Sequence, residues 1–201
     1  LQNGDLVPLA IFDKPDPLNG PFFEESLYVT PSRLPNQTQD LIIDTTARAL
    51  FALGLKDGPV HAELRINSLG AYVIEVGART IGGLCARSLQ FGTGMSLEEI
   101  VLRHTLRREL PSTEREGHAS GVMMIPIPEA GELKAVAGEK DALAVPGIED
   151  VTISIPVGQK LIPLPEGNKY LGFIFAKAET PESVEAALRE AHRRLAFEIS
   201  N

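Results

Sequence analysis

Two glutamates stand inside strand-like segments, where a pair of carboxylates could hold a cation. Glu63 lies in the run of residues 60–67, and Glu75 lies in the run of residues 71–79. The short link between these runs ends in Gly70, so we predict an antiparallel hairpin. If three residues form its loop and Gly70 is left-handed, Glu63 lies directly opposite Glu75.

Opposed carboxylates on neighbouring strands repel each other unless a positive charge neutralises them. Their β-carbons would lie about 5 Å apart, a separation that one divalent cation can bridge. Mg²⁺ is typically held by one or two carboxylates together with substrate phosphates. Strand alternation places Arg79 on the same face as Glu75, and its guanidinium offers several donors to a phosphoryl oxygen. These three side chains predict a nucleotide–metal site.

Two alternatives to this site stay open at the level of sequence. Glu63, Arg65, Glu75 and Arg79 could form a cross-strand lattice of ion pairs on a solvated sheet face, which needs no ligand. A loop of two or four residues would also place the two glutamates on opposite faces of the hairpin and remove the site.

The surrounding pattern predicts the elements that hold the hairpin. Residues 38–53 have helical spacing and end at Gly54, a helix C-cap. Ser96 with Glu99 forms a capping box that begins a helix running to about residue 110. The other expected elements are a strand at 6–12 after the Asn3-Gly4 turn, a loop at 13–21, an extended segment at 22–30 and a short helix from 82 to about 91.

A polar stretch after Pro111 predicts a boundary, with one domain over residues 1–116 and a small α+β domain over residues 117–201. Strands are expected at 121–127, 151–156 and 171–178, and Thr180-Pro181 predicts the start of a last helix. The expected fold class is therefore α+β, with an antiparallel sheet and helices in the first part.

Composition excludes several classes of protein. Apolar residues make up 43% of the 201 residues and charged residues 23%, which is typical of a folded globular chain. The formal charge of −8 and the lack of a basic cluster argue against nucleic-acid binding. No apolar run reaches membrane-spanning length and the start lacks a signal peptide, so we expect no membrane partner and a cytoplasmic location. Cys85 is the single cysteine, which excludes an internal disulfide framework.

The hairpin resembles the metal-binding strand pair of the ATP-grasp superfamily. The resemblance rests on Glu63, on the segment Glu75-Val76-Gly77-Ala78-Arg79 and on Gly82-Gly83. It implies that Glu63 and Glu75 bind Mg²⁺ or Mn²⁺ and that Arg79 contacts the γ-phosphate of ATP and an acyl phosphate. Its specific part covers residues 58–89, and the rest of the chain matches more loosely.

The wider context is similar to the bacterial L-amino acid ligases, which join free amino acids into dipeptides. His61-Ala62-Glu63 and Ile81-Gly82-Gly83-Leu84 carry this likeness. It implies a carboxylate–amine ligase that uses ATP and forms an acyl phosphate. The alternatives are another ATP-grasp activity, such as a purine-pathway ligase or a biotin carboxylase-like enzyme, and a non-catalytic binding module derived from the same fold.

The sequence departs from the family at two points. Many ATP-grasp enzymes have an asparagine two residues after the second glutamate as a further metal ligand, and this chain has Gly77 there. The number of metals therefore stays open. The family's adenine-contacting lysines, glycine-rich loop and amino-terminal substrate domain have no counterpart here. We therefore expect a missing amino-terminal half as partner, an inactive chain on its own, and an open oligomeric state that includes a homodimer.

Several further residues carry weaker predictions. His61 could contact substrate or orient a carboxylate, and Gly82 and Gly83 could offer amides to an anion at a helix start. The loop residues Lys14 and Arg33 could capture a carboxylate or be solvated, and Cys85 could be a nucleophile or a buried core residue. We expect His104 in the core, and no partner pattern is apparent for His118 and His192.

Overall fold

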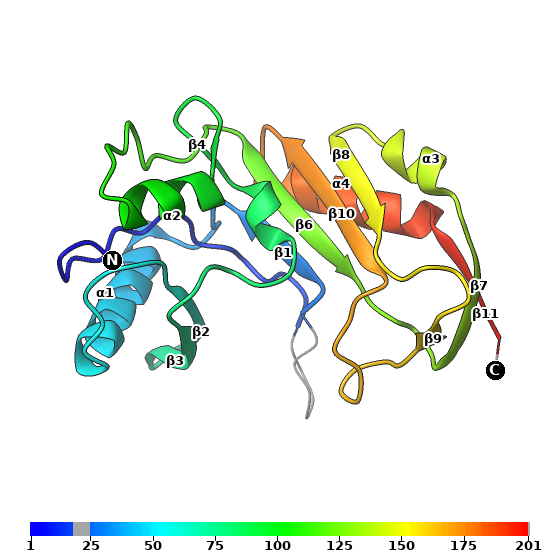
Figure 1. Cartoon of the computed structure of the whole chain (residues 1–201), viewed down its shortest axis with the longest axis horizontal. Helices are drawn as coiled ribbons and strands as arrows, with labels where there is room; N and C mark the ends of the chain where they lie inside the picture. The colour runs from blue at the N-terminus through cyan, green and yellow to red at the C-terminus, as the bar shows by residue number, and fades with distance from the viewer. Residues whose placement is uncertain (18–24, 201) are drawn as a thin grey trace. The chain divides into compact units, whose positions relative to one another are not determined.

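The computed structural model describes residues 1–17 and 25–200 (Figure 1). Its contacts divide the chain into two compact units. The first unit combines Leu1–Ile11 with Ser32–Gly117, and the second combines Phe12–Pro31 with His118–Asn201. Antiparallel sheets and helices make up both units, which confirms the predicted α+β class.

Helix α1 (Asn36–Ala52) is the long helix of the first unit and matches the helix predicted at 38–53. Its end is a Schellman motif, in which the Leu55 amide donates to the Leu50 carbonyl at 3.1 Å. Gly54 has a φ of +73°, a left-handed conformation that glycine adopts without strain. The predicted C-cap is confirmed.

Strands β2 (His61–Asn67) and β3 (Gly70–Gly77) form the predicted hairpin, but its loop is not the one expected. Asn67 pairs with Gly70, so the loop has two residues and the predicted three-residue loop is wrong. A register shift follows, because Leu64 pairs with Val73 whereas Glu63 pairs with Glu75. The predicted opposition of the two glutamates is nevertheless confirmed.

The rest of the first unit is shorter in regular structure than the sequence predicted. The helix expected from 82 to 91 is a single 3₁₀ turn, η1 (Cys85–Ser88), followed by strands β4 (Gln90–Phe91) and β5 (Met95–Ser96). Helix α2 (Leu97–Thr105) begins at the predicted cap, where Ser96 Oγ accepts from the Glu99 amide at 3.2 Å. It ends about five residues before the predicted position.

The strand predicted at residues 6–12 is wrong. This segment joins no ladder, and Pro8 within it lacks the amide that a central strand position needs. The Asn3-Gly4 turn is present, with positive φ at both residues and a bridge between Gln2 and Asp5. The loop expected at 13–21 and the extended segment at 22–30 lie partly outside the described residues, since residues 18–24 are not described.

The second unit is built on an antiparallel sheet of four strands in the order β1-β6-β10-β8. Their bounds are β1 (Leu27–Thr30), β6 (Ala119–Ile125), β10 (Gly172–Ala178) and β8 (Ile148–Ile153). The last three match the predicted strands within a few residues. Helix α4 (Pro181–Arg194) packs on this sheet (Figure 1), and its Thr180 cap accepts from the Ser183 amide at 3.2 Å, as predicted.

Four elements of the second unit were not predicted. They are β7 (Gly131–Ala137), α3 (Glu139–Leu143), β9 (Lys160–Leu161) and β11 (Ala196–Ser200). Strands β11, β7 and β9 form a three-stranded sheet. The core between sheets and helices is aliphatic and includes Leu133, Leu161, Leu171, Ile174 and Leu188.

Strand β1 belongs to the second unit because it pairs with β6, which lies about 90 residues further along the chain. The predicted division of the chain into domains at residues 116 and 117 stays a prediction. The contacts within the structure place Phe12–Pro31 in the second unit. Among the described residues, no helix has both the length and the hydropathy that crossing a bilayer requires.

Candidate metal and phosphate site

The candidate site lies on the β2–β3 hairpin of the first unit. Glu63 and Glu75 are Cα partners across the two strands, so their side chains lie on the same face of the hairpin. The pairing exists because Ile74 is an extra residue in β3, a β-bulge between Val73 and Glu75. Without the bulge, the two-residue loop would set Glu63 opposite Ile74.

His61 orients the first glutamate. Its Nε2 lies 2.9 Å from Glu63 Oε1, and the two side chains are only 15% and 20% exposed. The residues are two apart in β2 and therefore lie on one face, as strand alternation predicts. The histidine therefore holds one carboxylate oxygen, whereas its predicted contact with substrate stays a prediction.

Arg79 holds the second glutamate. Its Nη2 donates to Glu75 Oε1 at 3.0 Å, and its Nη1 donates to the Thr80 carbonyl at 3.0 Å. Both partners of the ion pair are 52% exposed. Exposed pairs of this kind contribute about 0–1 kcal/mol to stability. Arg79 could therefore leave Glu75 to bind a phosphate with little loss of folding free energy.

The donor set fits a hard divalent cation. Glu63 and Glu75 are cross-strand partners, and no group of three or more His, Cys, Asp or Glu side chains within residues 1–17 and 25–200 is placed to hold a metal. A site of two carboxylates suits Mg²⁺ or Mn²⁺ completed by phosphate oxygens and water. It does not suit structural zinc, which takes four protein ligands.

Two glycines flank the arginine. A β-carbon built on Gly77 would lie 3.1 Å from Arg79 Cγ and 3.2 Å from its Nε, whereas one on Gly82 would lie 3.8 Å from Nη1. The predicted helix start at Gly82 and Gly83 is wrong, because η1 begins only at Cys85 and has four residues. The amides of Gly82 and Gly83 therefore do not lie at a helix start, which was the reason to predict an anion site there.

The remaining predicted residues do not join this site. Lys14 forms an ion pair with Glu25 and lies 5.2 Å from the centroid of the Tyr28 ring, both in the second unit. Cys85 is 1% exposed, so the buried reading fits it better than the nucleophilic one. His104 is only partly buried. His192 lies on α4, and burial lowers its pKa.

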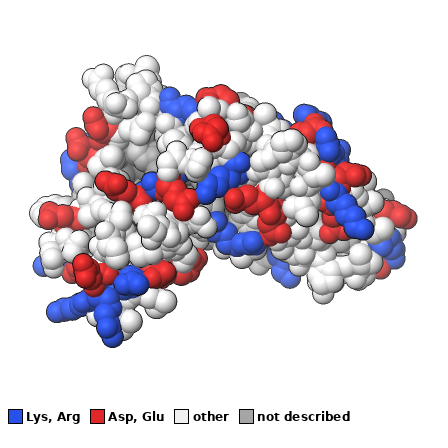
Figure 2. Space-filling view, turned by 90° about the horizontal axis from the view of Figure 1, so that it is seen from above, with Lys and Arg blue, Asp and Glu red and all other residues white. Residues whose placement is uncertain are grey.

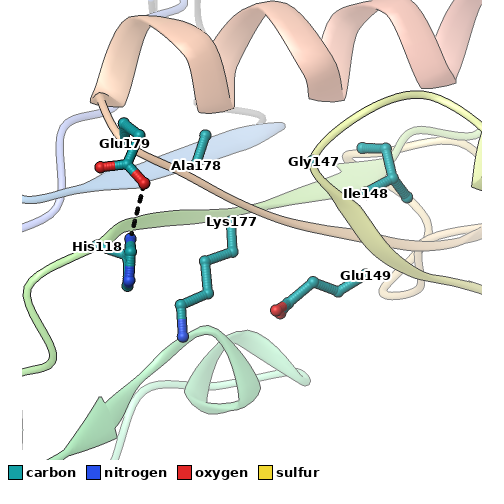
Figure 3. A pocket seen from close by; sticks show the side chains of 7 residues that line it. All are labelled: His118, Gly147, Ile148, Glu149, Lys177, Ala178 and Glu179. Atoms are coloured by element: carbon teal, nitrogen blue, oxygen red, sulfur yellow. Dashed lines mark ion pairs between the residues drawn. The ribbon is translucent and has the colours of Figure 1, made fainter.

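Sequence reasoning missed an open pocket in the second unit. It has a volume of about 340 Å³ and is lined by His118, Gly147, Ile148, Glu149, Lys177, Ala178 and Glu179 (Figure 3). His118 Nδ1 lies 3.4 Å from Glu179 Oε1. The lining residues come from three separate parts of the chain, at 118, 147–149 and 177–179. No local spacing could therefore have revealed the pocket.

Acidic and basic side chains are interspersed on the face seen in Figure 2. This mixture matches the many short-range ion pairs along the helices, such as Arg103 with Glu99 at 2.8 Å. The predictions that the chain binds no nucleic acid and lies in the cytoplasm stay predictions.

Comparison with known proteins bears directly on the hairpin. The family described as "ATP-grasp domain" matches residues 1–88, a range that includes Glu63, Glu75 and Arg79. The part of the chain that holds the hairpin is thus similar to an ATP-grasp domain. The family described as "L-amino acid ligase C-terminal domain 2" matches residues 123–200. The resemblance that the sequence indicated is therefore confirmed.

Solved structures share this fold over the whole length of the chain. The L-amino acid ligase from Bacillus licheniformis is 29% identical, with a TM-score of 0.82 over 100% of this chain and 50% of that one. Phosphoribosylglycinamide synthetase from Anaerococcus prevotii is 13% identical, with a TM-score of 0.79 over 100% and 51% of the two chains. The second likeness concerns the fold alone.

Curated relatives are longer than this chain. The protein y4rH of Sinorhizobium fredii is 24% identical over 170 residues, which are 85% of this chain and 36% of that protein. Human carnosine synthase 1 is 26% identical over 149 residues, which are 72% of this chain and 18% of the synthase. This chain thus spans between 18% and 51% of the length of the relatives named here.

Proposed function

We propose that this chain is the metal- and phosphate-binding part of an ATP-dependent ligase that joins a carboxylate to an amine. The observation that carries the proposal is the opposition of Glu63 and Glu75, with Arg79 bonded to Glu75. The ATP-grasp segment and the following L-amino acid ligase domain support it.

In the proposed reaction, a carboxylate oxygen of the substrate attacks the γ-phosphorus of ATP. The bond from that phosphorus to the β–γ bridging oxygen breaks, which gives ADP and an acyl phosphate. The amine then attacks the acyl carbon, loses a proton, and expels inorganic phosphate as the amide forms. Catalysis of such transfers comes mostly from positioning and from charge neutralisation.

The residues of this chain supply both effects. Glu63 and Glu75 would hold Mg²⁺, which when bound neutralises charge on the phosphates. Arg79 would leave Glu75 for the transferred phosphoryl group, to which its fork can donate two hydrogen bonds. His61 would keep Glu63 in the orientation that the cation requires, as outer-shell partners of metal ligands commonly do.

The substrate class follows from the second matched family. A domain of L-amino acid ligases over residues 123–200 favours amino acids as the carboxylate and the amine. Phosphoribosylglycinamide synthetase from Anaerococcus prevotii is 13% identical to this chain, and a biotin carboxylase from Campylobacter jejuni with a similar fold is 16% identical. No side chain of this hairpin distinguishes those reactions from amino acid ligation. We therefore retain amino acid ligation as the proposed activity.

We propose that further polypeptide completes the site, as the missing amino-terminal half predicted from the sequence would. In the described part of the chain, β2 and β3 pair only with each other, and helix α1 packs on β3. Its exposed apolar residues are Ile66, Leu69, Tyr72, Val73 and Ile74. Such a surface is typical of one that another segment covers, and we expect the chain alone to be inactive.

Mn²⁺ titration followed by electron paramagnetic resonance tests the metal site directly. We expect Mn²⁺ bound by the native chain to be lost when Glu63 and Glu75 are both changed to Gln. The matched control is Glu132→Gln, because Glu132 also forms an exposed ion pair, with Lys134 at 2.7 Å. Equal Mn²⁺ binding by the double variant and the control would contradict the proposal.

A further inference from the structure

Gly77 is not required by the backbone. It ends β3, and its φ lies outside the left-handed range that favours glycine. A residue with a side chain could therefore adopt this conformation without strain. The reason for a glycine at this position has to lie in the space around its Cα atom.

That space is filled by the arginine of the site. The three heavy atoms nearest to a β-carbon on Gly77 all belong to the Arg79 side chain: Cγ at 3.1 Å, Nε at 3.2 Å and Cζ at 3.5 Å. Two of these distances are shorter than ordinary carbon contacts. A β-carbon at position 77 would therefore require the Arg79 side chain to shift by a few tenths of an ångström, and a larger side chain would require a larger shift.

The path of the arginine explains the crowding. Glu75 and Arg79 are four residues apart, a separation of about 13 Å along a fully extended strand. Arg79 nevertheless reaches Glu75 Oε1 at 3.0 Å, because β3 ends at Gly77, the backbone bends at residues 78 and 79, and the Arg79 side chain lies close to Gly77. On its other side, a β-carbon at Gly82 would make only an ordinary contact with Nη1.

We propose that Gly77 is a positioning residue: because it lacks a side chain, it leaves the space in which Arg79 lies against Glu75. The importance of this Arg79 position for catalysis rests on the proposed function. The position itself, against Glu75 and next to Gly77, does not. It follows that an asparagine at position 77 would compete with Arg79 for the same space. In this structure the guanidinium of Arg79 therefore lies beside Glu75, where a third protein ligand could otherwise stand.

Side-chain NMR of the purified chain tests whether Gly77 allows this position of the Arg79 side chain. The Nε–Hε signal of Arg79 is assigned by its disappearance in Arg79→Ala. In the native chain we expect it to be displaced from the signals of exposed arginines and to move when Glu75 is changed to Gln. We expect a partial move toward the exposed position in Gly77→Ala and a complete one in Gly77→Val. Gly82→Ala is the control and should leave the signal in place.

An Arg79 signal that stays unchanged in both Gly77 variants would overturn the proposal. If a Gly77 variant fails to fold, the same substitution is made with Arg79→Ala. Recovery of the amide spectrum there supports the proposal, because the atoms nearest to a β-carbon at position 77 belong to the arginine. Failure to recover would show that the backbone needs glycine and would overturn it. Mn²⁺ binding is read separately, so loss of the metal site would contradict the proposed function alone.

Discussion

Glu63 lies directly opposite Glu75 although the hairpin loop that joins their strands has two residues and not three. The bulge at Ile74 restores a pairing that the loop alone would shift by one position. Bulges often lie next to functional sites, where they change the direction of a side chain. The acidic pair of the hairpin thus depends on one irregular residue in β3.

Removal of the guanidinium should affect chemistry more than binding. In an enzyme form that turns over, we expect Arg79→Ala to lower kcat by about 10²–10³-fold, the usual cost of losing one donor to a developing negative charge. The KM for ATP should change much less. Steady-state kinetics of ADP release measure both constants, and an unchanged kcat would remove Arg79 from the proposed reaction.

Loss of the histidine should weaken metal binding while both carboxylates remain. We expect His61→Ala to reduce Mn²⁺ affinity about 10–100-fold, because outer-shell partners fix the orientation of the ligands. His118→Ala is the matched control, since His118 also lies near a glutamate, Glu179, but in the other unit. Equal Mn²⁺ affinity of the two variants in titrations would contradict the orienting role of His61.

Close packing of α4 on the large sheet makes Gly121 a sensitive position. A β-carbon there would lie 2.6 Å from the Tyr28 carbonyl oxygen and 2.7 Å from Val184 Cγ1. We expect Gly121→Ala to lower the free energy of unfolding by about 1–3 kcal/mol, as overpacking does. Urea denaturation measures the loss. Gly117→Ala should have little effect, because no atom lies within 4 Å of a β-carbon at that position.

Acid should weaken the attachment of residue 16 to α4. Burial alone would raise the pKa of Asp16, but hydrogen bonds from Ser26 and Arg189 outweigh it and hold that pKa below its usual value. The bonds are Ser26 Oγ to Oδ2 at 2.7 Å and Arg189 Nη2 to Oδ1 at 2.6 Å.

Because the carboxyl is more acidic in the folded state, its contribution to stability is present above the unfolded pKa of about 3.8. That contribution is lost as the pH falls through the lower folded pKa. We expect the Tm of Asp16→Asn to lie below that of the native chain at pH 6 and to approach it near pH 2. A constant difference in Tm over this range, measured by circular dichroism, would contradict the linkage.

Features that depend on neighbours within a few residues were predicted from the sequence. Helix α1 ends at Gly54 because a left-handed residue closes the Schellman bonds there, and Ser96 and Thr180 cap their helices through the third amide that follows. The two strands of the hairpin were also predicted, because the alternation of residue types is a local property. Strand β3 ends at Gly77, two residues before the predicted end, and the roles of Glu63, Glu75 and Arg79 stay predictions.

Tertiary structure decided what depends on distant partners or on small irregularities. Residues 6–12 have the composition of a strand but no ladder, whereas β1 finds its partner about 90 residues away in β6. The loop length and the bulge at Ile74 changed the register in opposite directions, and no local rule predicts such a cancellation. The position of the Arg79 side chain next to Gly77 depends on the conformation of one side chain, which sequence spacing does not specify.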